Sequence, residues 1–449
     1  MSVRMIGCRH PSRAGRVLGT LAALALAGPA TAAPDPAAAR EVIAQAQALC
    51  DRDGGALWGV SLCGPLMIVD PADRAVVANQ ADAKGALVAR DGAYVGTLPA
   101  DAMLANTAMD WSGTRWTQLL WPLPTEPALL RVMLLHEMFH REQPALGLAR
   151  DEAGNRHLDS FDGRYLLQME WRALAHALME DEPDARRARL ADAFAFRQAR
   201  RARFPGAAAE EAALEINEGL AEYTGVRLGL AAPEQRRAYA IYALARFVDA
   251  PSFVRSFGYA SGPAYGLLLD QADPQWRGQL GADADLGRLL AGAAGIDATV
   301  PADLDARARR YDPDDRVRQA EQARERERQA RLAAWRAQLV DGPVLVLPLA
   351  RSRFQFNPQT LAALDGVGTV YPTLRLADAW GELLVDGGAA LVHADRKHAT
   401  VALPRGGDGR RGDGWTLALE PGWSLVPGER DGDLTVVAGK AQRTAPTTK

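Results

Sequence analysis

The sequence predicts an α+β fold, with β-strands at both ends of the chain and helices between them. Short apolar or alternating runs, separated by Asp, Gly, Pro and Asn, fill the region up to residue 125. Longer segments with helical apolar periodicity follow as far as residue 300. The short strand-like runs return after Gly342. A chain of 449 residues is too long for one core, so two or three domains are expected.

The first 32 residues have the pattern of a secretory signal peptide. Four arginines precede the apolar run "VLGTLAALALAG", which leads to the small residues "ATA" at positions 30–32. This order predicts a signal peptide over residues 1–32 with cleavage after Ala32, and hence a periplasmic or secreted protein. The leader has no paired arginines, which favours the general secretory route. A membrane anchor is the alternative, but the run is short for a span, so we expect no stable membrane span after signal cleavage.

The charge balance of the mature chain argues against an anionic partner. The whole chain holds 52 basic and 55 acidic residues, for a net charge of −3. Cleavage removes four arginines and no acids, which leaves 48 basic residues against 55 acidic ones, or −7. We therefore expect no nucleic-acid partner. The sequence gives no sign of an oligomeric state.

Two cysteines remain after the leader, Cys50 and Cys63. An exported protein meets oxidising conditions, so we expect a Cys50–Cys63 disulfide. In the chain-entropy model a loop this short contributes about 3 kcal/mol of stability. The alternative is two separate buried thiols.

The N-terminal part, residues 33–125, combines one helix with a predicted β-meander. The helix is expected over residues 35–50, "DPAAAREVIAQAQALC". The strand-like runs that follow are "ALWGVSLCG", "LMIVD", "AVVANQ", "ALVARDGAYVGTLP" and "RWTQLLWPLP".

Residues 126–300 are predicted to be mainly helical. The first helix follows a capping-type Thr125 and an early proline, and it ends before Pro144. Its middle, "ALLRVMLLHEMFH", is apolar almost throughout, which indicates a buried or half-buried helix. Further helices are expected over residues 163–180, 184–203, 207–229, 233–248 and 262–271.

Residues 301–341 form a predicted connector. The segment 313–339 is highly charged, and its few apolar residues are Val317, Leu332, Trp335 and Leu339. It lacks the sustained apolar heptad of a coiled coil. We therefore expect a solvated helix that packs at one end.

The C-terminal region, residues 342–440, is predicted to be a small all-β domain, followed by a disordered tail at 441–449. The runs that predict its strands are "PVLVLPLA", "GTVYPTLRL", "GELLVDGG", "AALVHA", "ATVALP", "WTLALE" and "DLTVVAG".

The strongest chemical signal is His136-Glu137-Met138-Phe139-His140 within the first helix of the helical region. Residues four apart share one helix face, so His136 and His140 can present their imidazoles to one metal ion. Glu137 lies about one step round the helix, within reach of a water molecule beside that metal. Two neutral imidazoles and a carboxylate suit Zn²⁺ with one open position, so one zinc ion per chain is predicted. The alternative is a core helix that carries two histidines with ordinary hydrogen-bond partners.

A third ligand is required, and the segment "EAALEINEGLAEYTG" at 211–225 offers one. Its Asn217-Glu218-Gly219 resembles the Asn-Glu-Gly segment of gluzincin metallopeptidases, the zinc aminopeptidase branch especially. The resemblance implies that Glu218 is the third zinc ligand. It also implies that Glu222, one turn on, holds a ligating histidine from outside the metal shell. By the same resemblance, residues 33–125 and 126–300 form one zincin-like catalytic unit.

The segment "SFGYASGPAYGLLLD" is similar to the Tyr-x-x-Gly stretch that precedes an apolar helix in the same branch. This resemblance implies that the Tyr259 hydroxyl stabilises an oxyanion. Tyr259 could equally be a buried or turn tyrosine. Tyr265 and Tyr223 remain rival donors.

The chain departs from the family pattern in two places. The step from His140 to Glu218 is 78 residues, so about 60 helical residues are inserted. The Gly-x-Met-Glu-Asn segment of the aminopeptidases is absent before His136, which leaves endo- and exopeptidase activity both open. Metzincins are excluded, because Gln143 and Leu146 stand where that class has Gly and His.

Rival ligands lie in the helical insertion. Glu170 is closer to the motif in sequence, although a lone Glu beside Trp and Arg is more often a structural ion pair. Asp162 weakly resembles the aspzincin Asp-x-x-Tyr motif. The tripeptide at 411–413 is interpreted as turn chemistry. The remaining candidate histidines are predicted to be surface or core residues: His157, His176, His393 and His398.

The sequence therefore predicts an exported zinc metallopeptidase acting on a peptide or protein substrate. Glu137 is the expected general base, Tyr259 the expected oxyanion donor, and the ligands are the two histidines and Glu218. One alternative is a cell-envelope binding or scaffold protein with a structural or inactive zinc site. Another is a zinc hydrolase whose substrate is a non-peptide amide.

Overall fold

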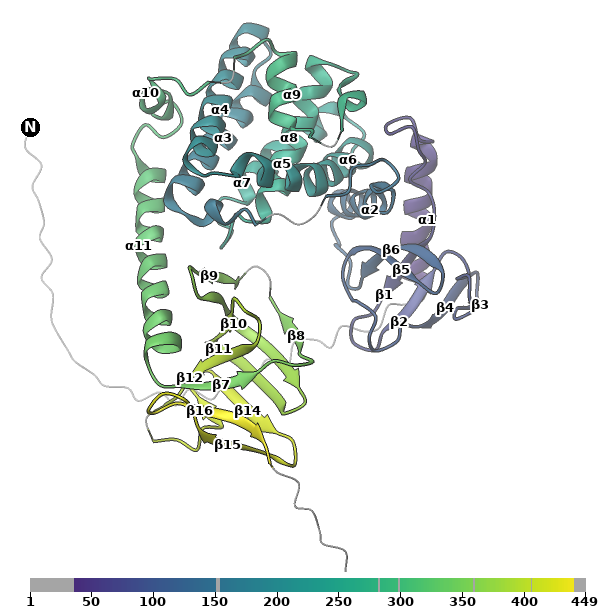
Figure 1. Cartoon of the computed structure of the whole chain (residues 1–449). Helices are drawn as coiled ribbons and strands as arrows, with labels where there is room; N and C mark the ends of the chain where they lie inside the picture. Colours follow the sequence, from purple (N-terminus) through teal and green to yellow (C-terminus); the bar gives the residue numbers. More distant parts are fainter. Residues whose placement is uncertain are drawn as a thin grey trace, which may run out of the picture.

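The computed structural model describes residues 36–150, 154–281, 283–297, 299–357, 360–404 and 406–439 (Figure 1). Helices occupy the middle of the chain, and a sheet lies on either side of them in sequence. The prediction of strands at both ends with helices between them is confirmed. The predicted signal peptide and tail fall outside the described residues. Within the described residues, no helix has both the length and the hydropathy to cross a membrane.

The N-terminal sheet is mixed, and the predicted meander is wrong. Its strand order is β3-β4-β2-β1-β6-β5, in which β1 pairs with β6 in parallel and β2 pairs with β4 rather than β3. The helix and strands are α1 (Pro36–Asp53), β1 (Leu66–Val69), β2 (Ala75–Ala78), β3 (Val88–Arg90), β4 (Ala93–Thr97), β5 (Thr107–Trp111) and β6 (Thr114–Leu120).

Strand β1 is paired on both edges, with β2 and β6, and both of its faces are covered. Ile68 points into the large core shared with the helices, and Met67 and Val69 belong to a smaller core on the other face. All four residues of β1 are buried, as expected of a strand covered on both sides. The run "ALWGVSLCG" before it forms turns instead of the predicted strand. That segment is tied to α1 by a disulfide between Cys50 and Cys63, the expected pairing.

The helical region begins with α2 (Pro127–Glu142), which carries the His-Glu-x-x-His motif. Its N-cap is Glu126, one residue after the predicted Thr125, and the Glu126 carboxylate accepts a hydrogen bond from the Leu129 amide at 2.7 Å. The helices that follow are α3 (Phe161–Met179), α4 (Pro183–Arg203), α5 (Ala207–Leu214), α6 (Leu220–Gly229), α7 (Pro233–Arg246), α8 (Ser256–Ala272), α9 (Leu286–Ala293) and α10 (Leu304–Ala308).

Two further features of this region differ from the prediction. The single helix expected over 207–229 is interrupted by a π-helical turn, η2 (Glu215–Gly219). Helix α8 starts at Ser256 rather than near residue 262, so Tyr259 lies in its first turn instead of before it. Short 3₁₀ turns also occur, at η1 (Arg156–Asp159) and η3 (Trp276–Gln279).

Small residues bring α2, α6 and α8 close together. A Cβ atom on Gly225 would lie 2.4 Å from the Val132 carbonyl oxygen of α2, and one on Gly262 would lie 2.2 Å from the Gly219 carbonyl oxygen. These contacts require glycine, because any side chain would meet backbone. They hold α6 against α2 and η2 against α8.

The connector helix α11 (Arg316–Arg336) ends in a π-helical turn, η4 (Ala337–Asp341), and it packs at both ends rather than one. Near its start, Val317 packs against the helical core. A buried ion pair joins Glu321 to Arg164 of α3 at 2.8 Å. Near its end, Trp335 packs with a small core of the C-terminal sheet. Figure 1 shows α11 running between the two regions.

The C-terminal region is a ten-stranded sheet with the order β13-β14-β11-β12-β7-β16-β15, and β10 pairs with β11, β8 and β9. The two runs "GELLVDGG" and "AALVHA" form one long strand, β11. The predictions missed β8, β9, β13 and β15; β8 is only four residues long and mostly exposed. The strands are β7 (Val344–Pro348), β8 (Arg353–Phe356), β9 (Ala362–Leu364), β10 (Gly368–Asp378), β11 (Gly381–His393), β12 (His398–Ala402), β13 (Arg411–Gly412), β14 (Trp415–Leu419), β15 (Trp423–Pro427) and β16 (Leu434–Ala438).

Candidate metal centre

Three side chains from α2 and η2 converge on one point. Nε2 of His136 lies 2.9 Å from Nε2 of His140. Oε2 of Glu218 lies 3.4 Å from the first of these nitrogens and 3.3 Å from the second. The three side chains are only 5%, 13% and 8% exposed. Residues 78 positions apart in sequence therefore form one compact, nearly buried group.

The spacing of these three atoms suits a zinc ion. Zinc–ligand bonds of about 2.0–2.2 Å at tetrahedral angles place neighbouring ligand atoms about 3.3 Å apart. The observed separations are 2.9, 3.3 and 3.4 Å. Two imidazoles and one carboxylate make a donor set that zinc accepts, with a fourth position left for water or substrate.

Hydrogen bonds on the far side of each imidazole set its tautomer. Nδ1 of His136 lies 2.9 Å from the Glu222 carboxylate, which can only accept, so this nitrogen carries a proton. Nδ1 of His140 lies 2.6 Å from Oε1 of Gln143. The Gln143 amide donates through Nε2 to the Asn217 carbonyl at 2.7 Å, so its oxygen must face the histidine. Both Nε2 atoms can thus present lone pairs toward Glu218.

Three facing acceptors repel one another unless a cation or a proton lies between them. Burial alone would lower the pKa of His136, but hydrogen bonds with Glu218 and Glu222 raise it from 6.5 to about 10. Burial would raise the pKa of Glu218, yet the two histidines lower it well below its ordinary value. Metal binding requires neutral imidazoles, so zinc affinity should fall as the pH falls.

Glu137 lies beside the cluster without joining it. Its side chain is buried, and its Oε2 has no hydrogen-bond partner among the described residues. Burial raises the pKa of the Glu137 carboxyl. A buried carboxylate oxygen without a partner is costly, so it needs a water molecule or a substrate group to bind. A proton acceptor next to three candidate ligands can serve as a general base.

Tyr259 approaches the cluster from α8. Its ring stacks on the His136 imidazole, with centroids 5.4 Å apart and planes 4° from parallel. Burial, and then the neighbouring Glu218 carboxylate, raise the pKa of Tyr259. The phenol therefore stays protonated near neutral pH and can donate a hydrogen bond.

The rival tyrosines are engaged elsewhere. The Tyr265 hydroxyl donates to Glu170 at 2.6 Å. The Tyr223 hydroxyl donates to Asp270 at 2.9 Å. Neither contact involves the cluster.

The rival carboxylates are also engaged elsewhere. Glu170 is fully buried between Arg197 and Arg200, at 3.1 and 2.6 Å, as a structural ion pair. Asp162 is about half exposed and lies 3.6 Å from Arg203.

The remaining histidines lie apart from the metal cluster. His157 contacts Glu211 at 2.9 Å, and His176 packs edge-on against Tyr311. His393 and His398 pack against each other at the β11–β12 hairpin, with ring centroids 4.0 Å apart and planes tilted by 31°. The tripeptide at 411–413 forms the short strand β13 and the turn after it.

A second group of candidate ligands is Cys50, Asp51 and Cys63. The disulfide between its two cysteines removes the thiolates that a metal would need. His136, His140 and Glu218 therefore form the better candidate among the described residues.

Sequence reasoning missed two supporting residues and one local distortion. Gln143 follows His140 by three residues, so it shares that helix face, and this spacing was the available signal. Tyr239 donates to Oε1 of Glu222 at 2.8 Å from α7, a contact that no local pattern predicts. The π-helical turn η2 was also unforeseen, although such turns occur frequently at functional sites.

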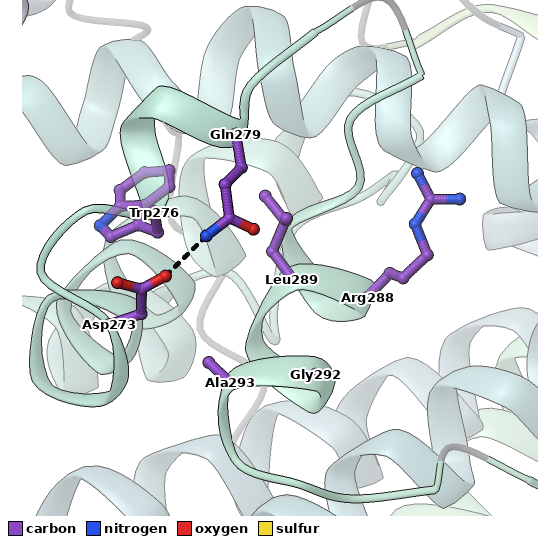
Figure 2. Close-up of a pocket in the computed structure, with 7 residues that line it drawn as sticks. All are labelled: Asp273, Trp276, Gln279, Arg288, Leu289, Gly292 and Ala293. Carbon is purple, nitrogen blue, oxygen red and sulfur yellow. Dashed lines mark hydrogen bonds between the residues drawn. The ribbon is translucent and has the colours of Figure 1, made fainter.

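Two surface cavities among the described residues lie outside the metal cluster. One of about 320 Å³ lies between η3 and α9, where Asp273 accepts a hydrogen bond from Gln279 (Figure 2). The other, about 460 Å³, is lined mainly by apolar and aromatic residues of α2 and α7, including Tyr239. Neither is lined by the three candidate ligands.

The chain was also compared with known proteins. No protein-family model, curated protein or solved structure matches it, so the chemistry of the site rests on its own residues.

Proposed function

We propose that this chain is a zinc-dependent peptidase with a gluzincin-like site and a zincin-like catalytic unit. The observation that carries the proposal is the convergence of His136, His140 and Glu218 beside a buried carboxylate, Glu137, that has an unpartnered oxygen. A structural zinc site has four protein ligands and no use for such a base. Three ligands and a base are the arrangement of a hydrolytic site.

Bound zinc would supply a Lewis acid that polarises the scissile carbonyl and lowers the pKa of a water molecule. The chain's own residues do the rest. Glu137 accepts the proton from the attacking water and passes it to the leaving amine nitrogen. Tyr259 donates its hydroxyl proton in a hydrogen bond to the carbonyl oxygen as negative charge develops there.

A peptide substrate is favoured by the sheet next to the site. Strand β5 stands at the end of the strand order, and among the described residues no strand pairs with its outer edge. Helix α2 packs against β5 and β6 (Figure 1). An unpaired strand edge can bind an extended peptide through main-chain hydrogen bonds, which a small non-peptide amide could not exploit.

The test combines metal analysis with hydrolysis. Purified protein should hold one zinc per chain and cleave members of a peptide library, and a chelator should abolish cleavage until zinc is restored. The Glu137→Gln variant should keep its zinc and lose activity by about 10²- to 10⁴-fold, because only the base is removed. Zinc without cleavage of any peptide would instead favour a binding protein or a hydrolase of other amides. Cleavage that survives complete zinc removal would contradict the proposal.

A further inference from the structure

The side chain of Gln143 connects two of the three candidate ligands. It is buried at the C-cap of α2, one residue beyond the last helical position. Its Oε1 lies 2.6 Å from Nδ1 of His140. Its Nε2 donates to the Asn217 carbonyl at 2.7 Å and to the Ile216 carbonyl at 3.2 Å.

Both carbonyl acceptors belong to η2, the π-helical turn that carries Glu218. A π-helical turn shifts the hydrogen-bond ladder, which leaves carbonyls available to a side chain. Gln143 takes two of these carbonyls, from the residues directly before Glu218. The turn is thereby held against the end of α2.

The orientation of the Gln143 amide fixes the roles of both its oxygen and its nitrogen. Because Nε2 faces two carbonyl oxygens, the amide cannot flip without bringing Oε1 against them. Oε1 is thus fixed as the acceptor for His140, which must carry its proton on Nδ1 and leave Nε2 free. The same amide group therefore sets the tautomer of one ligand and the position of another.

We infer that Gln143 is a positioning residue of the metal centre, which pre-sets His140 and Glu218 together for a zinc ion. This inference rests on the proposed function. The inference extends that proposal by naming the side chain that connects His140 with the turn carrying Glu218, 78 residues later in the sequence. The partner of His136 is the charged Glu222, whereas the partner of His140 is this neutral amide, so the two histidines are supported differently.

The test measures zinc affinity by competition with a chromophoric chelator. Gln143→Met keeps the length of the side chain and removes both hydrogen-bonding halves. Zinc affinity should fall by about 10- to 100-fold, the usual effect of losing a partner of a ligating histidine. Gln143→Glu keeps an acceptor for His140 but loses the donor to η2, so its affinity should lie between those of wild type and Gln143→Met.

Gln118→Met is the matched control. Gln118 is buried in β6 and donates to the Met103 and Ala105 carbonyls at 3.1 and 2.8 Å, so its loss also removes two buried hydrogen bonds. Its stability should fall as in Gln143→Met while its zinc affinity stays within twofold of wild type. The visible spectrum of cobalt-substituted protein should change in Gln143→Met and not in Gln118→Met.

The results distinguish the role of Gln143 from the proposed zinc peptidase function. Wild-type affinity and an unchanged cobalt spectrum in Gln143→Met would overturn the role of Gln143 and leave the zinc peptidase proposal intact. Equal zinc losses in Gln143→Met and Gln118→Met would also overturn it, because the effect would then follow stability alone. A wild-type chain that binds no zinc would overturn both.

Discussion

Nδ1 of His136 lies 2.9 Å from Oε2 of Glu222, one helical turn beyond Glu218. The other carboxylate oxygen of Glu222 accepts from the Tyr239 hydroxyl at 2.8 Å. The carboxylate is thus held at both oxygens, and it fixes the imidazole with Nε2 toward the metal position.

Replacing Glu222 by Leu should weaken zinc binding by about 10- to 100-fold, since His136 loses the acceptor that orients it. Competition titration with a chelator measures this. Tyr239→Phe removes only the outer hydrogen bond, so its effect should be smaller. A larger loss in Tyr239→Phe than in Glu222→Leu would argue against Glu222 as the orienting group.

Tyr259→Phe should lower kcat by about 10²- to 10³-fold, the usual effect of losing one oxyanion donor. Zinc affinity should hardly change, because phenylalanine preserves the stacking on His136. Tyr265→Phe is the comparison, since that hydroxyl is bound to Glu170. It should lose stability and keep kcat. If steady-state kinetics showed a loss of kcat in Tyr265→Phe and none in Tyr259→Phe, Tyr265 would be the oxyanion donor instead.

Gly262→Ala should destabilise the protein by about 1–3 kcal/mol, because its Cβ would lie 2.2 Å from the Gly219 carbonyl oxygen and force α8 away from η2. Zinc affinity should fall too, because Gly219 adjoins Glu218. Gly292→Ala in α9 is the control. Its Cβ would meet no atom within 4 Å, so alanine there should stabilise by about 0.5–1 kcal/mol. Urea unfolding of both variants measures the contrast.

Acid should weaken the helical core through Glu211. Burial alone would raise its pKa, but Arg200, His157 and Arg201 lower it well below the ordinary value of 4.5. A lowered pKa in the folded state stabilises the protein above the unfolded value, and this stabilisation is lost as the pH falls from about 4.5 through the folded pKa.

Unfolding with chelator present, from pH 7 down to pH 3, tests this. Glu211→Gln should be less stable than wild type at pH 7 by about 1.5–3 kcal/mol, because Arg200 and Arg201 each lose one of their two carboxylate partners. Its stability should also fall less steeply with acid. Exposed Glu234→Gln should follow the wild-type curve. Parallel curves for Glu211→Gln and wild type would exclude Glu211 as the titrating group.

The helices were the most predictable part of the fold. Their signals are local: α4 was expected over 184–203 and spans Pro183–Arg203, because a proline at its start and a regular apolar period mark it. Strand partners were not predictable. The parallel pairing of β1 with β6 depends on which faces the helices cover. The apolar residues of β1 indicate a buried strand, but they do not indicate which strand pairs with it.

The residues of the candidate site also fall into those that local spacing predicts and those that depend on tertiary contacts. His136, Glu137 and His140 follow from spacing within one helix. Glu218 was inferred from a resemblance, and the structure places it 3.3 Å from His140. In the sequence, Gln143 shows only that the metzincin pattern is absent. Its role depends on two carbonyls of a π-helical turn that no helical pattern predicts.

The most direct test of the metal centre is a crystal structure of zinc-loaded protein with anomalous data collected at the zinc edge. One anomalous peak is expected per chain, about 2.0–2.2 Å from Nε2 of His136, Nε2 of His140 and a carboxylate oxygen of Glu218. The Glu137 carboxylate should lie next to the open position without binding the metal. A peak near Cys50, Asp51 and Cys63, or none at the histidines, would contradict the account.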